Sequence, residues 1–230
     1  MPRVSSPRLE KLAAALAVVT FLIFVLLQGK PYFTNASRPP RGIPDSEAAI
    51  QAVRSVEEVD DILGDAPSPD REVMRFKQRL DLAFMASHTG LLMILAIILS
   101  RQGGWASVAA AAAMAIAAAA AVFNVMQDLA ILAILDVPLV VTTPQMMNAI
   151  RRPSAAKWAL AALALTLMAA LLWQKGDWWS RLTGALLLLT AVLMAYGLHD
   201  NRFFFYQRYA YATALIGIAG VYLPRWRGDF

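Results

Sequence analysis

The chain has 230 residues, of which 59% are hydrophobic and only 16% are charged, and its mean hydropathy is +0.53. A soluble domain carries about a quarter charged residues, so this composition indicates a membrane protein. The net charge of +5 does not indicate nucleic-acid binding, because no soluble segment interleaves a basic cluster with aromatic residues. The absence of cysteine from the sequence excludes disulfides, thiolate metal sites and cysteine nucleophiles.

The first predicted element is an apolar run over residues 12–27, which follows the basic residues Arg3, Arg8 and Lys11. This pattern fits either an uncleaved first span or a signal peptide. No small-x-small cleavage site directly follows the run, so we favour an uncleaved span whose basic N-terminus lies in the cytoplasm. Residues 1–28 are therefore predicted to form an N-terminal transmembrane anchor.

Residues 29–68 form an extended polar segment, which we expect to lie outside the membrane. Several prolines make its first part irregular, whereas apolar residues at three- to four-residue steps over residues 49–59 predict an amphipathic helix or a pair of helices. Ser55 and Glu58 fit a capping box, and Gly64 fits a helix end. We expect this segment to pack on the membrane surface or on the bundle. The alternative is a lid over a site beneath it.

Residues 69–230 are expected to form the transmembrane bundle. A serine followed by Pro69 predicts a helix start, and this helix is expected to continue directly into a span that begins at Asp81. Basic residues such as Arg71 and Lys77 precede that span. At this position the ordinary expectation is contact with lipid headgroups.

The next span, over residues 105–135, is rich in alanine and is expected to lie centrally, because small side chains let helices approach closely. It exceeds the length that a bilayer core needs, so it either projects from the membrane or bends near Asp128. Residues 155–172 and 182–198 give two more spans, and residues 203–223 a sixth or a helix half-inserted in the interface. The sequence thus predicts an all-α transmembrane bundle of about six spans, or five.

Up-and-down alternation of these spans brings their polar side chains to one membrane face. Asp81 and His88 lie two helical turns apart on one stripe, and Asn124 and Asp128 are at positions i and i+4 with Gln127 beside them. The ligand-pocket candidates are Asp81, His88, Asn124, Gln127, Asp128, Lys157, His199 and Arg202. Ionisable groups inside spans normally face a bundle interior or an aqueous cavity. The pattern predicts a polar pocket open to one face, with a lysine or an arginine as counter-charge. Carboxylates that simply reach water, with amides that bond between helices, remain the alternative.

A metal site is the weaker interpretation of the same residues. It would require Asp81, His88, Asp128 and His199 to meet, as ligands suited to zinc or iron. A histidine on an apolar helix is more often held by a hydrogen bond, so we predict no metal. The sequence names no cofactor.

Residues 55–89, followed by residues 122–132, resemble a group of uncharacterised bacterial multi-span membrane proteins. That group often opens one span with Asp-x-x-Phe and a nearby tyrosine, and ends the next span with Asp-x-x-Glu-Asn. Asp81 and Phe84 match the first element, and His88 stands near the expected tyrosine. The second element differs, and its three places hold Asn124, Gln127 and Asp128. The resemblance implies a bacterial inner-membrane protein and carries no activity.

The sequence favours a non-enzymatic component that binds a lipid, a quinone or a partner protein through the polar pocket, because no catalytic motif is present. The alternative is a small membrane-embedded enzyme that acts on an amphiphile with Asp81 or Asp128 as base or metal ligand. A transporter is disfavoured, since the sequence shows no inverted repeat. The expected partners are the lipid bilayer and such a ligand or membrane protein, and not nucleic acid. The expected location is the bacterial cytoplasmic (inner) membrane, multi-pass, with a cytoplasmic N-terminus.

Overall fold

A computed structural model describes residues 6–34, 40–43, 46–200 and 202–223, and all regular structure within them is helical. The elements are α1 Pro7–Gln28, η1 Pro40–Gly42, α2 Ser46–Gln51, α3 Val56–Leu63, α4 Pro69–Ser100, α5 Trp105–Ile134, η2 Leu139–Val141, α6 Pro144–Lys175, α7 Trp178–His199 and α8 Phe203–Tyr222. Five of the described helices, α1, α4, α5, α6 and α7, are long and apolar enough to cross a membrane. The predicted all-α membrane bundle is confirmed.

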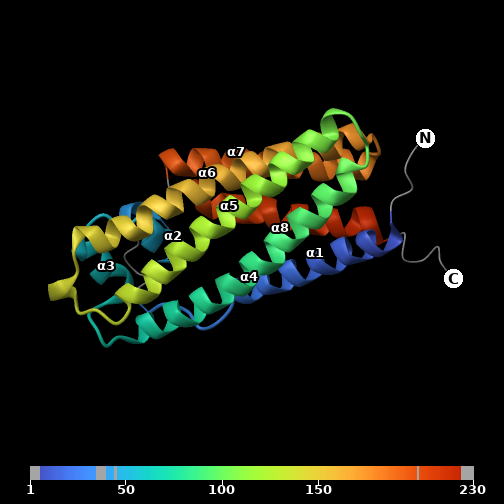
Figure 1. The fold of residues 1–230 in the computed structure, drawn as a ribbon. Helices are drawn as coiled ribbons and strands as arrows, with labels where there is room; N and C mark the ends of the chain where they lie inside the picture. The colour runs from blue at the N-terminus through green and yellow to red at the C-terminus, as the bar shows by residue number, and fades with distance from the viewer. Residues whose placement is uncertain (1–5, 35–39, 44–45, 201, 224–230) are drawn as a thin grey trace.

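The long helices form a closed ring in chain order. Each of α1, α4, α5, α6, α7 and α8 packs against the next, and α8 returns to pack against α1 (Figure 1). Neighbours in the ring are antiparallel, so the start of α1 and the end of α8 lie at the same end of the molecule. α8 is not among the five described helices that are long and apolar enough to cross a membrane, and it carries Gln207 and Arg208 in its second turn. The prediction of about six spans is consistent with five apolar helices and α8 beside them.

The alanine-rich helix α5 is a member of this ring and does not lie at its centre, contrary to the prediction. Alanines such as Ala110, Ala113 and Ala117 are buried on its inner side, whereas Val108 and Val122 are 72% and 60% exposed. The small side chains allow close packing with both α4 and α6, but every helix of a ring keeps an outer face. α5 continues through Asp128 as one helix of 30 residues, which is longer than a bilayer core needs.

A second hydrophobic core lies at one end of the bundle. α4, α5 and α6 have 32, 30 and 32 residues, and at about 1.5 Å per residue they exceed the roughly 30 Å of a hydrocarbon core. Their ends pack with α2 and α3, and we call this unit the cap. Its buried apolar residues include Ile43, Ile50, Val53, Val59, Ile62, Leu63, Met74, Ile131, Ile134 and Ile150. The polar segment after α1 therefore packs on the bundle.

Local signals set the helix ends of the cap. The Ser55 hydroxyl accepts a hydrogen bond from the backbone N–H of Glu58 at 3.3 Å, and the Glu58 carboxylate accepts from the backbone N–H of Arg54 at 2.6 Å. The reciprocal bond of the predicted capping box thus falls one residue earlier than expected. Gly64 ends α3 with a φ of +66°, a conformation that glycine adopts without strain. Of the two predictions for this segment, the pair of helices is correct.

Two basic residues at the start of α4 do not face lipid headgroups as predicted. Arg71 is buried, and its guanidinium donates at 2.8–3.0 Å to three backbone oxygens just after and within the last turn of α5. Lys77 is also buried, donates to the Leu27 carbonyl at the end of α1, and forms an ion pair with Glu47 at 2.8 Å. The last carbonyls of a helix have no partner within it, and cations are favourable there. Both side chains therefore cap helix ends.

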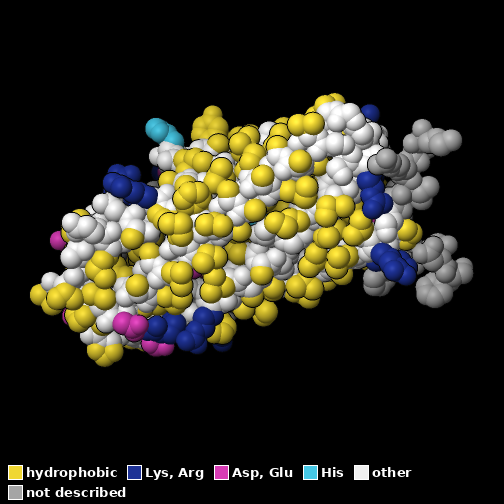
Figure 2. All heavy atoms as spheres, viewed as in Figure 1, with side chains coloured by type: hydrophobic (Ala, Val, Ile, Leu, Met, Phe, Trp, Pro, Cys, Tyr) yellow, Lys and Arg dark blue, Asp and Glu magenta, His cyan; other side chains and the backbone are white. Residues whose placement is uncertain are grey.

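The outer surface fits a lipid environment. Figure 2 shows hydrophobic side chains along the length of the visible face, Lys and Arg side chains near both of its ends, and Asp and Glu side chains mainly near the cap end. Large apolar residues point outward on several helices, among them Leu26, Leu129 and Leu188. This distribution is the reverse of a soluble protein and matches a multi-pass membrane protein.

Candidate functional site

The ring of helices surrounds a cavity of about 140 Å³ that is partly open to the outside. All six ring helices and α2 contribute to its wall. On α4 the lining residues extend from Asp81 to Leu92, which corresponds to a length of about 16 Å along the helix. This volume is the space that the centre of a water molecule can reach, and one water needs about 10–15 Å³ of it. The cavity therefore has room for a lipid headgroup or an aromatic ring, but not for a whole lipid.

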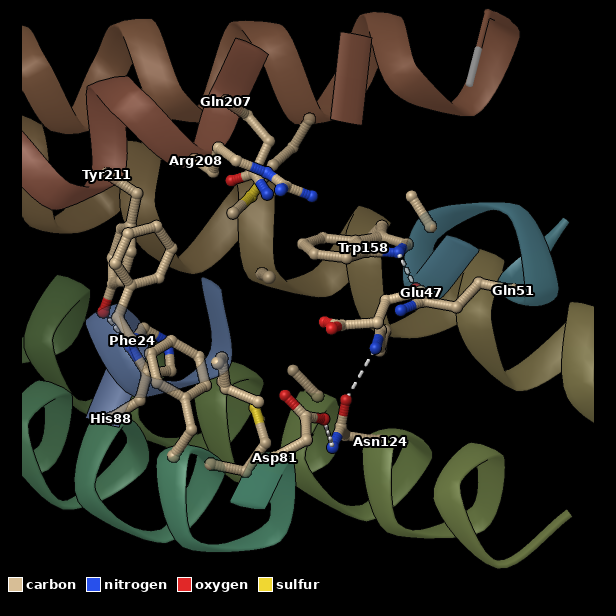
Figure 3. A pocket seen from close by; sticks show the side chains of 18 of the residues that line it. Phe24, Glu47, Gln51, Asp81, His88, Asn124, Trp158, Gln207, Arg208 and Tyr211 are labelled. Carbon is tan, nitrogen blue, oxygen red and sulfur yellow. Dashed lines mark hydrogen bonds between the residues drawn. The ribbon is translucent and has the colours of Figure 1, made fainter. Parts of the chain in front are cut away.

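Asn124 organises the polar end of the cavity. Its Nδ2 donates to a carboxylate oxygen of Asp81 at 3.1 Å (Figure 3). The same Nδ2 donates to Asp128 at 2.7 Å, and the side-chain oxygen accepts from the Lys157 ammonium at 2.7 Å. An ammonium only donates and ionised carboxylates only accept, so these three partners fix the orientation of the amide. One residue of α5 thereby joins α4 and α6.

The cluster is buried in depth. Asn124 is 1% exposed and Asp128 and Gln127 are fully buried behind it, where Gln127 donates to Asp128 at 3.3 Å. Asp81 is only partly buried and lines the cavity. Burial of several charges is costly unless each is hydrogen-bonded, and inside membranes such residues usually mark functional sites.

Helix α2 covers the polar end. The Trp158 indole N–H donates to Gln51 at 2.9 Å, and Ser154 donates to the same oxygen at 3.3 Å, so α2 is tied to α6. Glu47 ties it to α4 through the ion pair with Lys77. The Lys157 ammonium lies 4.8 Å from the centre of the Trp158 ring, which is a cation–π distance. The packing role and the covering role considered for this segment are thus combined in one helix.

The deeper end is apolar and aromatic. Phe84 and His88 are stacked with their ring centres 5.8 Å apart, and Phe24 lies 6.4 Å from Phe84. His88 Nδ1 is hydrogen-bonded to the hydroxyl of Tyr211 on α8. Leu92 and alanines of α5 and α6 complete this part of the wall. The predicted stripe from Asp81 to His88 therefore does line one cavity, and the histidine is held by a hydrogen bond.

Most of the predicted site residues come together, and two do not. Asp81, Asn124, Gln127, Asp128 and Lys157 form the buried cluster, and His88 lines the same cavity deeper in. The exceptions are at the end of α7 and just after it, where His199 and Arg202 are exposed.

The geometry of α7 explains both exceptions. Met194 of this helix lines the cavity, and five residues later the chain has turned about 140° further round the helix, which directs His199 outward. Arg202 pairs with Asp200 at 2.6 Å. Lys157 is therefore the counter-charge nearest the carboxylates. The four-residue metal alternative is not assembled, and the described residues contain no group of three or more potential metal ligands of the His, Cys, Asp and Glu types.

Several polar or aromatic wall residues were not among the predicted site residues, and they include Glu47, Gln51, Trp158, Arg208 and Tyr211. The signal for Arg208 was an arginine within an aromatic helix, which is unusual in a span. Its guanidinium donates to Gln28 of α1 at 2.5 Å. No periodicity singles out the others, because their position in the wall depends on how α2, α6 and α8 pack.

Comparison of the chain with protein-family models, with curated proteins and with solved structures found no match. The family resemblance of the sequence stays a prediction, and function is inferred from the geometry of the cavity.

Proposed function

We propose that this membrane protein is a non-enzymatic component that binds an amphiphile, a lipid or a quinone, within the ring of helices. The polar head would lie at the cap end, beside Asp81 and Lys157, and the apolar part would extend toward Phe84 and Leu92. The observation that carries this proposal is the gradient of polarity along a single cavity, from buried charges to aromatic and aliphatic side chains. Such sites combine an apolar wall with a few placed polar groups.

The depth of the cavity supports an amphiphile over a small polar solute. Its polar end lies beneath the cap, and its apolar end lies about two to three helical turns further along α4, toward the middle of the span. A headgroup placed at the polar end would keep its ionic contacts, while an attached chain would replace water next to apolar side chains. Burial of each CH₂ group contributes about 0.8 kcal/mol.

Matched substitutions on α6 test this function. Ala161 lines the cavity, whereas Ala159 is exposed on the outside of the same helix. The protein would be placed in nanodiscs of defined phospholipids with a short-chain ubiquinone, and retained molecules would be identified by native mass spectrometry. We expect wild type and Ala159→Phe to retain a stoichiometric lipid or quinone and Ala161→Phe to lose it. Equal retention by both variants, or empty wild-type protein, would contradict the proposal.

We also propose that the protein lies in a bacterial cytoplasmic membrane with its N-terminus in the cytoplasm and the cap outside. The end of the bundle opposite the cap carries the basic residues Arg8, Lys11, Arg101, Lys175 and Arg181. Excess Lys and Arg in short loops marks the cytoplasmic side. Because the chain has no cysteine, Arg101→Cys and Glu57→Cys each give one labelling site. In intact spheroplasts an impermeant maleimide should label only the second, and the reverse result would invert the topology.

A further inference from the structure

Groups of opposite sign line the polar end of the cavity. The Asp81 carboxylate lines it on α4, the Lys157 ammonium lines it on α6, and the Arg208 guanidinium lines it on α8. Glu47 also lines the cavity, but it is paired with Lys77 at 2.8 Å. A buried ion that is left without a partner is costly. The lining therefore favours a headgroup that carries both a cation and an anion.

The two signs are nevertheless kept apart. The amide of Asn124 stands between the Lys157 ammonium and both carboxylates, since its oxygen takes the first and its nitrogen takes the others. Arg208 lies on α8, across the cavity from Asp81 and Asn124 (Figure 3). The cavity is thus dipolar in arrangement, with the Asp81 carboxylate on the α4 wall and the Arg208 guanidinium on the α8 wall.

We infer that the headgroup bound here is a zwitterion with a primary amine and a phosphate, as in an ethanolamine phospholipid. Its ammonium would lie against Asp81, and its phosphate would lie toward Arg208 and Lys157. This inference rests on the proposed function, because it assigns the head of the amphiphile in the same cavity.

Two contacts favour a primary amine over a quaternary one. A primary ammonium donates hydrogen bonds to a carboxylate, whereas a trimethylammonium has no N–H to donate. Recognition of a quaternary ammonium uses the open faces of aromatic rings, and Lys157 already lies over one face of Trp158, the indole of the polar end. A choline headgroup would therefore lose the hydrogen bond and find this face occupied.

A competition between headgroups tests the inference. Wild-type protein in nanodiscs with equal amounts of ethanolamine, glycerol and choline phospholipids of the same chains would be released gently, and the retained lipid would be measured by native mass spectrometry. We expect about tenfold enrichment of the ethanolamine lipid, the effect of one charge-assisted hydrogen bond. Asp81→Asn should remove the preference over choline lipid, and Arg202→Gln, an exposed charge outside the cavity, should leave it unchanged.

A second variant covers the case in which Asp81→Asn does not fold. Arg208→Gln should lower retention of the ethanolamine lipid severalfold, because the phosphate loses its cation. Free glycerophosphoethanolamine, a phosphodiester without net charge, that binds wild type in detergent, and not Arg208→Gln, would support the same chemistry with a soluble source.

The failures of the two proposals differ. If wild type retains glycerol or choline lipid as well as ethanolamine lipid, and Ala161→Phe still abolishes retention, the zwitterion inference is wrong while the cavity still binds an amphiphile. If wild type retains no lipid or quinone, the proposed function fails, and the inference fails with it.

Discussion

Replacement of Arg71 by methionine should lower the stability of the contact between the cap and the bundle. The Arg71 guanidinium donates to the carbonyls of Ile134, Leu135 and Val137 after and within the last turn of α5, and to Gly64 at the end of α3. It is 2% exposed. Methionine keeps much of the apolar stem but provides no donor, so Arg71→Met tests the hydrogen bonds more than the packing.

The cost can be estimated from burial. The bonds to Ile134 and Leu135 are fully buried, whereas those to Gly64 and Val137 are partly accessible to water. A buried acceptor that loses its donor costs about 1–3 kcal/mol. Water can replace the two accessible bonds, so only the two buried carbonyls lose their donor. At about 2 kcal/mol each, the cap loses about 4 kcal/mol of local stability.

Native-state amide hydrogen exchange in detergent measures this local stability at α3 and the end of α5. Arg75→Met is the matched control, because Arg75 lies one turn further along α4 and pairs with the exposed carboxylates of Glu72 and Asp136. Exposed pairs contribute about 0–1 kcal/mol. If Arg71→Met accelerates exchange in the cap no more than Arg75→Met, the capping argument is refuted.

Three further predictions concern packing, pH and the polar cluster. Gly184→Ala should destabilise the α6–α7 contact by about 1–3 kcal/mol, because a Cβ there would lie 2.9 Å from a backbone oxygen of α6, whereas Gly220→Ala has open space and should be neutral or stabilising in thermal unfolding. The backbone N–H of Leu139 lowers the pKa of the Asp65 carboxyl by bonding to its ionised form. This bond stabilises the folded protein at pH values above the ordinary pKa of an aspartate, and the stabilisation is lost as the pH falls through the lowered pKa of the folded protein. The Tm difference between wild type and Asp65→Asn should therefore shrink between about pH 6 and pH 3, and a constant difference would contradict it. Asn124→Leu should lower stability by about 3 kcal/mol and abolish ligand retention, because Asp81, Asp128 and Lys157 lose their common hydrogen-bond partner; an unchanged Tm would exclude that role.

The parts of the fold that follow from local rules could be predicted from the sequence. Pro69 after a serine starts α4, and Gly64 ends α3, because both signals act within a few residues. The contact of Asp81 with Asn124 follows from antiparallel neighbours of known length. The patch of Asn124 and Asp128 follows from the helical repeat.

The parts that depend on tertiary packing could not be predicted. Whether Arg71 faces lipid or caps a neighbouring helix depends on where α5 ends in space, and not on the residues around Arg71. The rotation of α7 decides that His199 faces outward, and the closure of the ring by α8 decides that Arg208 and Tyr211 line the cavity. A central position for α5 was a reasonable expectation for alanine, but a ring has no central helix.

The contact between α1 and α8 joins the first and the last helix of the ring. Helices are synthesised and inserted in chain order, so until α8 enters the bilayer the future cavity is an open groove between α1 and α7. Insertion of α8 closes that groove, and the hydrogen bond between Arg208 and Gln28 joins α8 to α1. On the proposed function, a headgroup that enters the groove from the side before this step would be held in the cavity afterwards. The ligand would then bind while the protein is being inserted into the membrane, and it would exchange slowly afterwards.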